Sequence, residues 1–253
     1  MNVVKIMGGL GNQLFQYAIG QKLKQYDSIG YDISYYSSEI NKNGDVPHRD
    51  FLLPWLVDGL VFSDQEDRER VNQWEYDPGK VYQNKYFWGD WQKAKLFEGV
   101  DLGIHLDEGL MSTNDIINEG FVMFDFIQSL ESVAIHVRRT DYEGLGWLLP
   151  MNYYKRAIER MEQKTNNAIF FVFSDDIPWC QENLQLPDGY YLHYAGPLTD
   201  FYLMSQCKHQ IIANSSFSFW AAYLNPNPEK IVIYPENWIC TSNPCEGLNW
   251  EGL

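Results

Sequence analysis

The sequence predicts an α/β protein, and for its second half a doubly wound parallel sheet. Short apolar runs of strand type alternate there with helical patterns about eight to twelve residues long. Strands that are buried on both faces read as unbroken apolar runs, and a helix between successive strands makes a βαβ unit. The chain also begins with a strand, a glycine-rich turn and a helix, so its first half is expected to be α/β as well.

The first half is regular only at its start. VVKIM at 3–7 predicts a buried strand, and the glycine turn that follows leads into a helix over about 13–25. Residues 65–71 have a helical pattern. The remainder of 26–128 is rich in Trp, Tyr, Asp and Asn and shows no clear period, so no further element is assigned there.

The second half is regular from residue 129 onward. The expected strands are SVAIHV at 132–137, AIFFVF at 168–173, residues 190–193, QIIA at 210–213 and KIVIY at 230–234. The expected helices are 152–163, 178–183, 199–206 with Thr199 as its cap, and 217–224. The change in pattern predicts an N-terminal domain over 1–128 and a C-terminal domain over 129–253, with the boundary near 126–131.

Composition limits the possible partners. The 253 residues are 45% hydrophobic, enough for a sizeable core, and no run of ~20 apolar residues is present. The 34 acidic and 19 basic residues give a net charge of −15, which disfavours nucleic acid and anionic membranes. We expect a cytoplasmic protein without a signal peptide, with at most peripheral membrane contact. An anionic ligand would have to be attracted by a few placed arginines and backbone N–H groups.

The four cysteines show neither a C-x-x-C pair nor zinc-ligand spacing. We expect them to be reduced, buried thiols. The short separation of Cys240 and Cys245 leaves a disulfide between them open.

Candidate site residues follow the expected strands. In an open parallel sheet, ligands bind beyond the carboxyl ends of the strands, where helix N-termini present N–H groups. The residues at these positions are His136, Arg138, Arg139 and Asp141; Asp175 and Asp176; Asn214, Ser215, Ser216, Phe217 and Ser218; and Gly9, Gly11, Asn12 and Gln13.

The two adjacent arginines favour a site for a diphosphate. Because neighbouring side chains alternate in direction, one arginine is expected to face the ligand and the other to pair with a carboxylate such as Asp141. Arginine and a serine-rich helix start together make a metal-free diphosphate site. Two plainer interpretations remain: both arginines form surface ion pairs, and the serines are ordinary N-caps.

Cofactor motifs are weak. The glycine turn is not G-x-G-x-x-G, and no acidic residue follows at dinucleotide spacing. Asp175 and Asp176 can bind a metal, but no further carboxylate or histidine joins them in the sequence. Hydrogen bonds to ligand hydroxyls, or helix capping, are the favoured interpretations. We therefore expect no cofactor and no metal.

Four blocks of sequence resemble a known family. They are GGLGNQLFQYA at 8–18, HVRRTDY at 136–142, FSDD at 173–176 and DFYLMSQCKHQIIANSSFSFWAAYLN at 200–225. In that order they resemble the bacterial α-1,2-fucosyltransferases, glycosyltransferase family 11, over nearly the whole chain, and more distantly the α-1,6- and protein O-fucosyltransferases. The resemblance implies a GT-B-like fold of two Rossmann-type halves. It also implies inverting, metal-independent transfer of L-fucose from GDP-β-L-fucose to the 2-hydroxyl of a glycan such as a β-galactoside.

The resemblance also implies roles for the candidate residues. Arg138 would hold the β-phosphate and stabilise the departing GDP, while His136 and Asp200 would contact the guanosine. Ser216 and Phe217 would offer backbone N–H groups to the phosphates. Asp175 and Asp176 match an acidic pair of these enzymes, and Gly9, Gly11, Asn12 and Gln13 would line the cleft from the other domain.

Three points stay open at the level of sequence. The general base is undecided among Asp141, Glu143, Asp32, Asp45, Asp50 and Asp90. The acceptor is an oligosaccharide or glycolipid, in the cytoplasm or at the inner face of the cell membrane. The alternative functions are transfer of another GDP-deoxyhexose such as colitose, a non-catalytic glycan-binding protein, and a nucleotide-dependent oxidoreductase.

Overall fold

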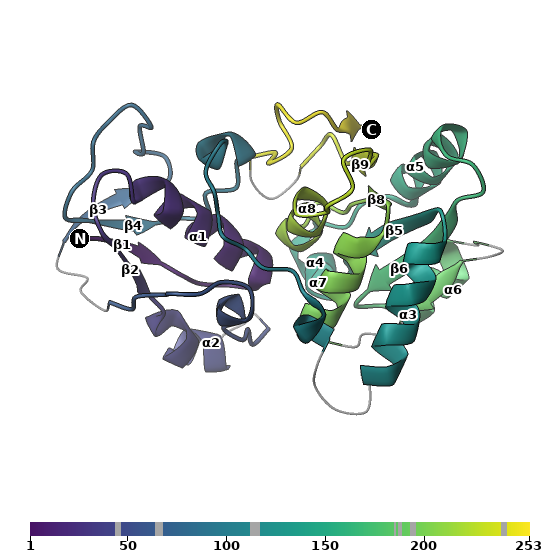
Figure 1. Cartoon of the computed structure of the whole chain (residues 1–253), viewed down its shortest axis with the longest axis horizontal. Helices are drawn as coiled ribbons and strands as arrows, with labels where there is room; N and C mark the ends of the chain where they lie inside the picture. Colours follow the sequence, from purple (N-terminus) through teal and green to yellow (C-terminus); the bar gives the residue numbers. More distant parts are fainter. Residues whose placement is uncertain are drawn as a thin grey trace. The chain divides into compact units, whose positions relative to one another are not determined.

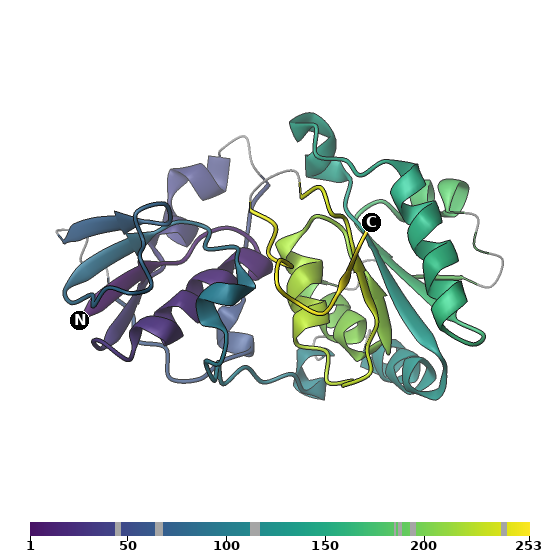
Figure 2. The same ribbon diagram turned by 90° about the horizontal axis from the view of Figure 1, so that it is seen from above.

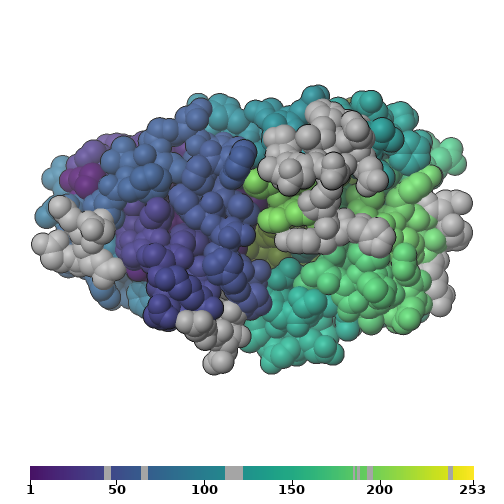
Figure 3. Space-filling model, turned by 90° about the horizontal axis from the view of Figure 1, so that it is seen from below, coloured from purple at the N-terminus to yellow at the C-terminus, as the bar shows by residue number. Residues whose placement is uncertain are grey.

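Two parallel β-sheets organise the chain, one in each of two units, Met1–His105 and Leu106–Leu253 (Figure 1). The computed structural model describes residues 1–43, 47–63, 68–111, 117–184, 186, 189–192, 196–238 and 242–253. Figure 3 shows the surface of the first unit in purple to blue and that of the second in teal to green.

The first unit has a four-stranded sheet in the order β2-β1-β4-β3. Its strands are β1 (Asn2–Lys5), β2 (Ile29–Asp32), β3 (Glu69–Asn72) and β4 (Lys85–Trp88). Helix α1 (Leu10–Leu23) packs on β1 and β2 through Leu14, Phe15 and Ala18, all fully buried. The short helices are η1 (Ser34–Ser37), α2 (Glu39–Asn43), η2 (Leu53–Trp55) and η3 (Ala94–Phe97).

The predicted first strand and helix are confirmed as β1 and α1, but the helix at 65–71 is wrong where it can be checked. Residues 69–71 belong to β3, which pairs in parallel with β4. Residues 65–67 lie outside the described residues. Strands β2, β3 and β4 were not predicted, because IGYD, ERVN and KYFW mix polar and apolar residues over only four positions.

The second unit has a six-stranded parallel sheet in the order β10-β9-β8-β5-β6-β7. The strands are β5 (Ser132–Val137), β6 (Ile169–Ser174), β7 (Tyr190–Leu192), β8 (His209–Ile211), β9 (Val232–Tyr234) and β10 (Glu251–Gly252). The five predicted strands are therefore present. The sixth, β10, was missed because two residues carry no pattern.

Helices lie on both faces of this sheet (Figures 1 and 2), as a doubly wound fold requires. They are η4 (Glu108–Met111), α3 (Ile117–Ser129), α4 (Thr140–Leu145), α5 (Met151–Lys164), α6 (Ile177–Asn183), α7 (Pro197–Gln206) and α8 (Ser216–Tyr223). Helices α5 and α6 pack on the face that carries Val133 and Ile135. On the other face, Phe126 of α3 contacts Phe171.

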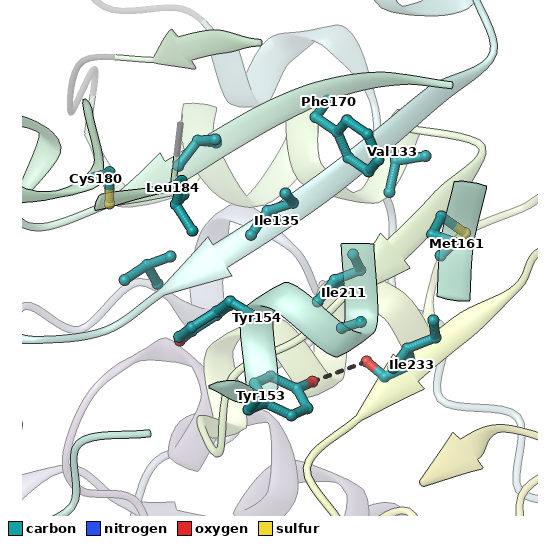
Figure 4. Close-up of a cluster of buried hydrophobic side chains, with 13 residues drawn as sticks. Val133, Ile135, Tyr153, Tyr154, Met161, Phe170, Cys180, Leu184, Ile211 and Ile233 are labelled. Carbon is teal, nitrogen blue, oxygen red and sulfur yellow. Dashed lines mark hydrogen bonds between the residues drawn. The ribbon is translucent and has the colours of Figure 1, made fainter. Parts of the chain in front are cut away.

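The core of the second unit lies between α5 and the sheet (Figure 4). Val133, Ile135 and Ile211 are fully buried there. The hydroxyl of Tyr153 donates to the carbonyls of Ile212 at 2.6 Å and Ile233 at 3.3 Å, which ties α5 to two strand ends. This packing fixes the carboxyl edge of the sheet, where the candidate site lies.

Two expectations about boundaries differ from the structure. The structure divides the chain after His105 rather than after residue 128, because α3 packs on α7, where Phe124 stacks on Tyr202 at 5.7 Å. Thr199 is not the cap of α7: the helix begins at Pro197, with Gly196 in the N-cap position at φ 112°. Proline at the first helical position makes this early start favourable.

Within the described ranges, no helix has both the length and the apolar character needed to cross a bilayer. Cys180, Cys207 and Cys245 are buried, unbridged thiols, as expected. Cys240 lies outside the described residues, so its pairing with Cys245 stays a prediction.

Candidate functional site

The strand order of the second unit reverses beside β5. From β5 the chain moves outward through β6 and β7, and it then returns to the other side of β5 as β8. Ligands of open α/β sheets bind at such a reversal, beyond the carboxyl ends of the strands. Residues 138–141 follow β5 and residues 214–218 follow β8 at this point, with 175–176 after β6.

Arg138 lies at this point between two carboxylates. Its Nε and Nη2 donate to Oδ1 and Oδ2 of Asp141 at 2.8 and 2.9 Å. Its Nη1 lies 3.1 Å from Oδ2 of Asp175. Burial works against the charge of Arg138, but the bond to Asp141 and the charges of both carboxylates outweigh burial and raise its pKa. The guanidinium is thus held charged and in one orientation.

Arg139 points to a different partner. Its Nε lies 3.1 Å from Oδ2 of Asp176, and its guanidinium lies over the ring of Trp179 at 3.9 Å. The expectation that the second arginine pairs with Asp141 is therefore wrong: Asp141 is bonded to Arg138. Alternation along the strand end sends the two arginines apart, and the next turn of chain brings Asp141 back to Arg138.

The two aspartates after β6 organise the site from within. Asp175 accepts hydrogen bonds from the backbone N–H of Arg139 at 2.9 Å and from the N–H and hydroxyl of Thr140 at 3.3 and 2.6 Å. Asp176 caps α6 by accepting from the N–H of Trp179 at 3.2 Å, which confirms the capping interpretation for this residue. Among the residues that the structure describes, no three His, Cys, Asp or Glu side chains gather as a metal site.

His136 is buried under the start of α8. Its ring lies 5.7 Å from that of Phe217, and Phe217 in turn contacts Phe201 of α7 at 5.4 Å. Burial, and then the charge of Arg138, lower the pKa of His136 to about 3 even though Asp175 acts in the opposite sense. The imidazole is therefore neutral at pH 7, and its Nδ1 has no hydrogen-bond partner among the described residues.

The serine-rich segment after β8 uses its side chains locally. The amide of Asn214 donates to the carbonyl of Trp147 at 3.0 Å, and the Tyr142 hydroxyl donates to the carbonyl of Asn214 at 3.3 Å. The hydroxyl of Ser218 donates to the carbonyl of Ser215 at 3.2 Å. Ser215 is the N-cap of α8, so the backbone N–H groups of its first turn, starting at Ser216, are the donors suited to an anion.

Asp200 is buried in the first turn of α7, directly before Phe201, which contacts Phe217. The structure therefore brings together in the second unit the residues predicted after β5, β6 and β8, with Asp200 close by in the chain to a residue of this cluster.

The four candidates in the glycine turn lie in the first unit. Gly9 is the N-cap of α1, and Gly11 is buried in the first turn of that helix. Gly8 has φ 79°, a conformation that favours glycine, and a Cβ there would lie 3.0 Å from Nδ2 of Asn12. The oxygen of the Asn12 amide accepts from Gln92 at 3.1 Å.

Gln13 is fully buried, and its amide holds a neighbouring loop. Its Nε2 donates to the carbonyls of Gly8 at 3.1 Å and Asp50 at 2.8 Å. Its Oε1 accepts from the N–H groups of Leu52 and Leu53 at 2.9 and 3.0 Å. The side chain of Gln13 thus shapes the loop after the glycine turn.

Three aromatic residues of the site were not predicted. Tyr142 carries Arg138 over its ring at 5.8 Å and contacts Trp147 edge-on at 5.5 Å. Trp179 lies under Arg139. Tyr142 lies inside the HVRRTDY block, which is a usable signal. Trp147 and Trp179 reach the site through turns whose course no local pattern indicates.

The fold defines the class of the protein. A crystal structure of the α-1,6-fucosyltransferase NodZ soaked with GDP-fucose matches 96% of this chain and 96% of its own, with a TM-score of 0.56 and 15% identity. NodZ co-crystallised with GDP matches with a TM-score of 0.52 and 14% identity. The chain thus has the GT-B-like fold of these glycosyltransferases, as expected.

The family follows from the sequence comparison. The model described as glycosyl transferase family 11 matches residues 83–243, more than half of the chain. The chain belongs to glycosyltransferase family 11 and is an enzyme. This membership confirms the glycosyltransferase expectation over the non-catalytic and oxidoreductase alternatives.

Named relatives share the similarity over most of the chain. The O-antigen biosynthesis glycosyltransferase WbnK of Escherichia coli is 29% identical, over 94% of this chain and 95% of its own. An α-1,2-colitosyltransferase of Escherichia coli is also 29% identical, over 93% and 91%. The galactoside α-(1,2)-fucosyltransferase 2 of Mus musculus is 32% identical, over 44% of this chain and 35% of its own.

Proposed function

We propose that the protein transfers L-fucose from GDP-β-L-fucose to the 2-hydroxyl of a glycan acceptor, forming an α-1,2 linkage with inversion and without a metal. The observation that carries the proposal is the charged, oriented guanidinium of Arg138 at the strand reversal, beside the first turn of α8. The named relatives support transfer of a GDP-linked deoxyhexose.

Arg138 is suited to act on the leaving group. Fucosyl transfer passes through a transition state in which the bond to the diphosphate stretches and negative charge grows on GDP. A fixed cation at that position stabilises the transition state more than the ground state. Arg138 makes contacts with Asp141 and Asp175 through part of its guanidinium, which leaves its other N–H groups for phosphate oxygens.

The neighbouring groups supply the rest of the donor site. The neutral imidazole of His136, with Nδ1 unpartnered among the described residues, offers a hydrogen bond to the guanosine. The N–H groups of Ser216 and Phe217 bind the phosphates, and Asp200 binds the guanine edge. Asp141 and Asp175 hold Arg138, while Asp176 holds Arg139. Gly9, Gly11 and Asn12 act from the first unit.

No cofactor takes part in this proposal, because the arginine and the helix start supply the positive potential that a metal would otherwise provide. The acceptor is an oligosaccharide or glycolipid that ends in a β-galactoside. We place the reaction in the bacterial cytoplasm, at the inner face of the membrane where such glycans are assembled.

The proposal is tested by calorimetric titration of the purified protein with GDP, GDP-fucose and NADH in EDTA. We expect GDP and GDP-fucose to bind and NADH not to bind, with no effect of EDTA. Lack of GDP binding at millimolar concentration contradicts the donor site. The linkage is then tested by incubation with GDP-fucose and β-galactosides and by nuclear magnetic resonance of the product.

Colitose is the second candidate for the transferred sugar, because the colitosyltransferase covers nearly the whole chain. The two donors differ by one hydroxyl, so competition between GDP-fucose and GDP-colitose for one acceptor separates them. A larger kcat/KM for GDP-fucose supports the main proposal, and the reverse order replaces it.

A further inference from the structure

Asp90 lies at the carboxyl edge of the sheet in the first unit, beside the glycine turn. It is the second residue after β4, which pairs in parallel with β1, so both strands end at the same edge. The amide of Gln16 joins the two ends: it accepts from the N–H of Met7 at 2.8 Å and donates to the carbonyl of Gly89 at 3.3 Å. Asp90 therefore follows a segment bonded to the start of the turn.

The backbone at Asp90 is fixed on both sides. The oxygen of the Gln73 side chain accepts from the N–H groups of Asp90 at 2.7 Å and Trp91 at 3.0 Å. Trp91 is buried with φ 56°, a left-handed conformation that a bulky residue adopts rarely. Strain of this kind is found where a side chain must be held in one place, at ligand clamps and active sites.

The carboxylate of Asp90 makes no ion pair or hydrogen bond within the described ranges, although the residue is half-buried. Burial alone raises its pKa above that of an ordinary aspartate. A half-buried carboxylate usually has a partner, since desolvation without one is unfavourable. A carboxylate that lacks one is ready to accept a proton from a ligand.

The other carboxylates considered from the sequence are engaged or exposed. Asp32 is buried against Tyr86 and Lys5, and Asp141 is bonded to Arg138. Asp50 is 72% exposed and faces His48, and Glu143 is exposed. Asp45 lies outside the described residues. Asp90 is the one of those described that combines partial burial, a fixed backbone and no partner within the described ranges.

We propose that Asp90 is the general base, the group that takes the proton from the attacking hydroxyl of the acceptor sugar. This inference rests on the proposed function. As the acceptor oxygen bonds to C1 of fucose, its O–H bond breaks and the proton passes to the Asp90 carboxylate. The bond from C1 to the phosphate oxygen breaks, and its electron pair leaves with GDP. The proton then passes from Asp90 to water.

The first test compares wild-type protein with Asp90→Asn, using GDP-fucose and a simple β-galactoside. Loss of a general base lowers rates by about 10²–10⁴-fold, so we expect kcat to fall within that range. Binding of GDP, measured by calorimetry, stays unchanged. The melting temperature stays equal or rises, because the amide is easier to bury than an unpaired carboxylate. A residue with only a structural role would give the opposite pattern of stability and activity.

Asp50→Asn is the matched control, the same change at an exposed aspartate of the same unit. It is expected to leave kcat unaltered. A second variant, Asp90→Ala, is assayed with sodium azide in place of the sugar acceptor. Azide carries no proton to remove, so this variant should form α-fucosyl azide and GDP at a rate that rises with azide concentration.

The outcomes separate the two proposals. Wild-type protein that transfers no sugar from GDP-fucose or GDP-colitose contradicts the proposed function. Active wild-type protein with an Asp90→Asn kcat within about threefold of it overturns the assignment of the base alone. An inactive Asp90→Ala variant that azide does not rescue overturns it as well, since its defect then lies elsewhere.

Discussion

The guanidinium of Arg138 is held by the carboxylate of Asp141 through two parallel hydrogen bonds, from Nε to Oδ1 at 2.8 Å and from Nη2 to Oδ2 at 2.9 Å. This paired geometry fixes both the position and the plane of the cation. Asp175 contacts the third nitrogen of Arg138 and also binds the backbone of Arg139, so the end of β6 supports the end of β5.

Replacement of Arg138 tests whether this cation stabilises the leaving group. Arg138→Ala is expected to abolish detectable transfer, and Arg138→Lys to lower kcat by about 10²–10³, because lysine carries the charge without the planar fork. Circular dichroism and thermal melting report on the fold. A well-folded Arg138→Ala enzyme with transfer close to that of the wild type would contradict the site described here.

Asp141→Asn tests the orientation of Arg138 separately from its charge. The neutral amide keeps the shape but can accept only one of the two hydrogen bonds, so the guanidinium is held less firmly. We expect kcat/KM to fall by about 10-fold or more, in line with the ~1.5–3 kcal/mol of a hydrogen bond to a charged group. Glu143→Gln, an exposed change in the same helix, serves as the control. Equal kinetics for both variants would show that the fork is unimportant.

The sequence allowed the scaffold of the second unit to be predicted because its strands are buried on both faces. SVAIHV and AIFFVF are long apolar runs, and both form strands at the expected positions. In the first unit β3 is ERVN, in which only Val71 is buried, so its period is indistinguishable from that of a helix. Its strand character comes from pairing with β4, a tertiary effect.

The positions of the site residues were also predictable, but their partners were not. The rule that ligands bind beyond parallel strands brought Arg138 and Asp175 to one edge. It does not say which arginine meets which aspartate, since that depends on the course of the turn into α4. Asp90 was one of several open carboxylates because burial and the left-handed Trp91 depend on folding of the whole unit.

Asp32 is expected to make the stability of the first unit sensitive to acid. Burial raises the pKa of Asp32, but hydrogen bonds from Tyr86 and Ser34 and the charge of Lys5 outweigh burial and hold that pKa below its ordinary value. A depressed pKa contributes stability that is present above the unfolded value of about 4 and is lost as pH falls through the folded value. We expect Asp32→Asn to lower the free energy of unfolding by about 2 kcal/mol at pH 7.

The measurement is urea unfolding of wild-type and Asp32→Asn protein between pH 3 and 7. The difference between them should shrink below about pH 4, where the wild-type carboxylate loses its advantage. A difference that stays constant across this range would mean that the ionised form of Asp32 is not what stabilises the fold.

Tyr153→Phe tests the tie between α5 and the sheet beneath the donor site. The buried Tyr153 hydroxyl donates to the carbonyls of Ile212 and Ile233, and its removal leaves both acceptors with less hydrogen bonding in the core (Figure 4). We expect the free energy of unfolding to fall by about 1–2 kcal/mol, measured by urea denaturation. Tyr154→Phe is the control, because the Tyr154 hydroxyl makes no hydrogen bond to another described residue. If both variants lose the same stability, the effect comes from packing around the ring, and the hydrogen bond to the strand ends contributes nothing measurable.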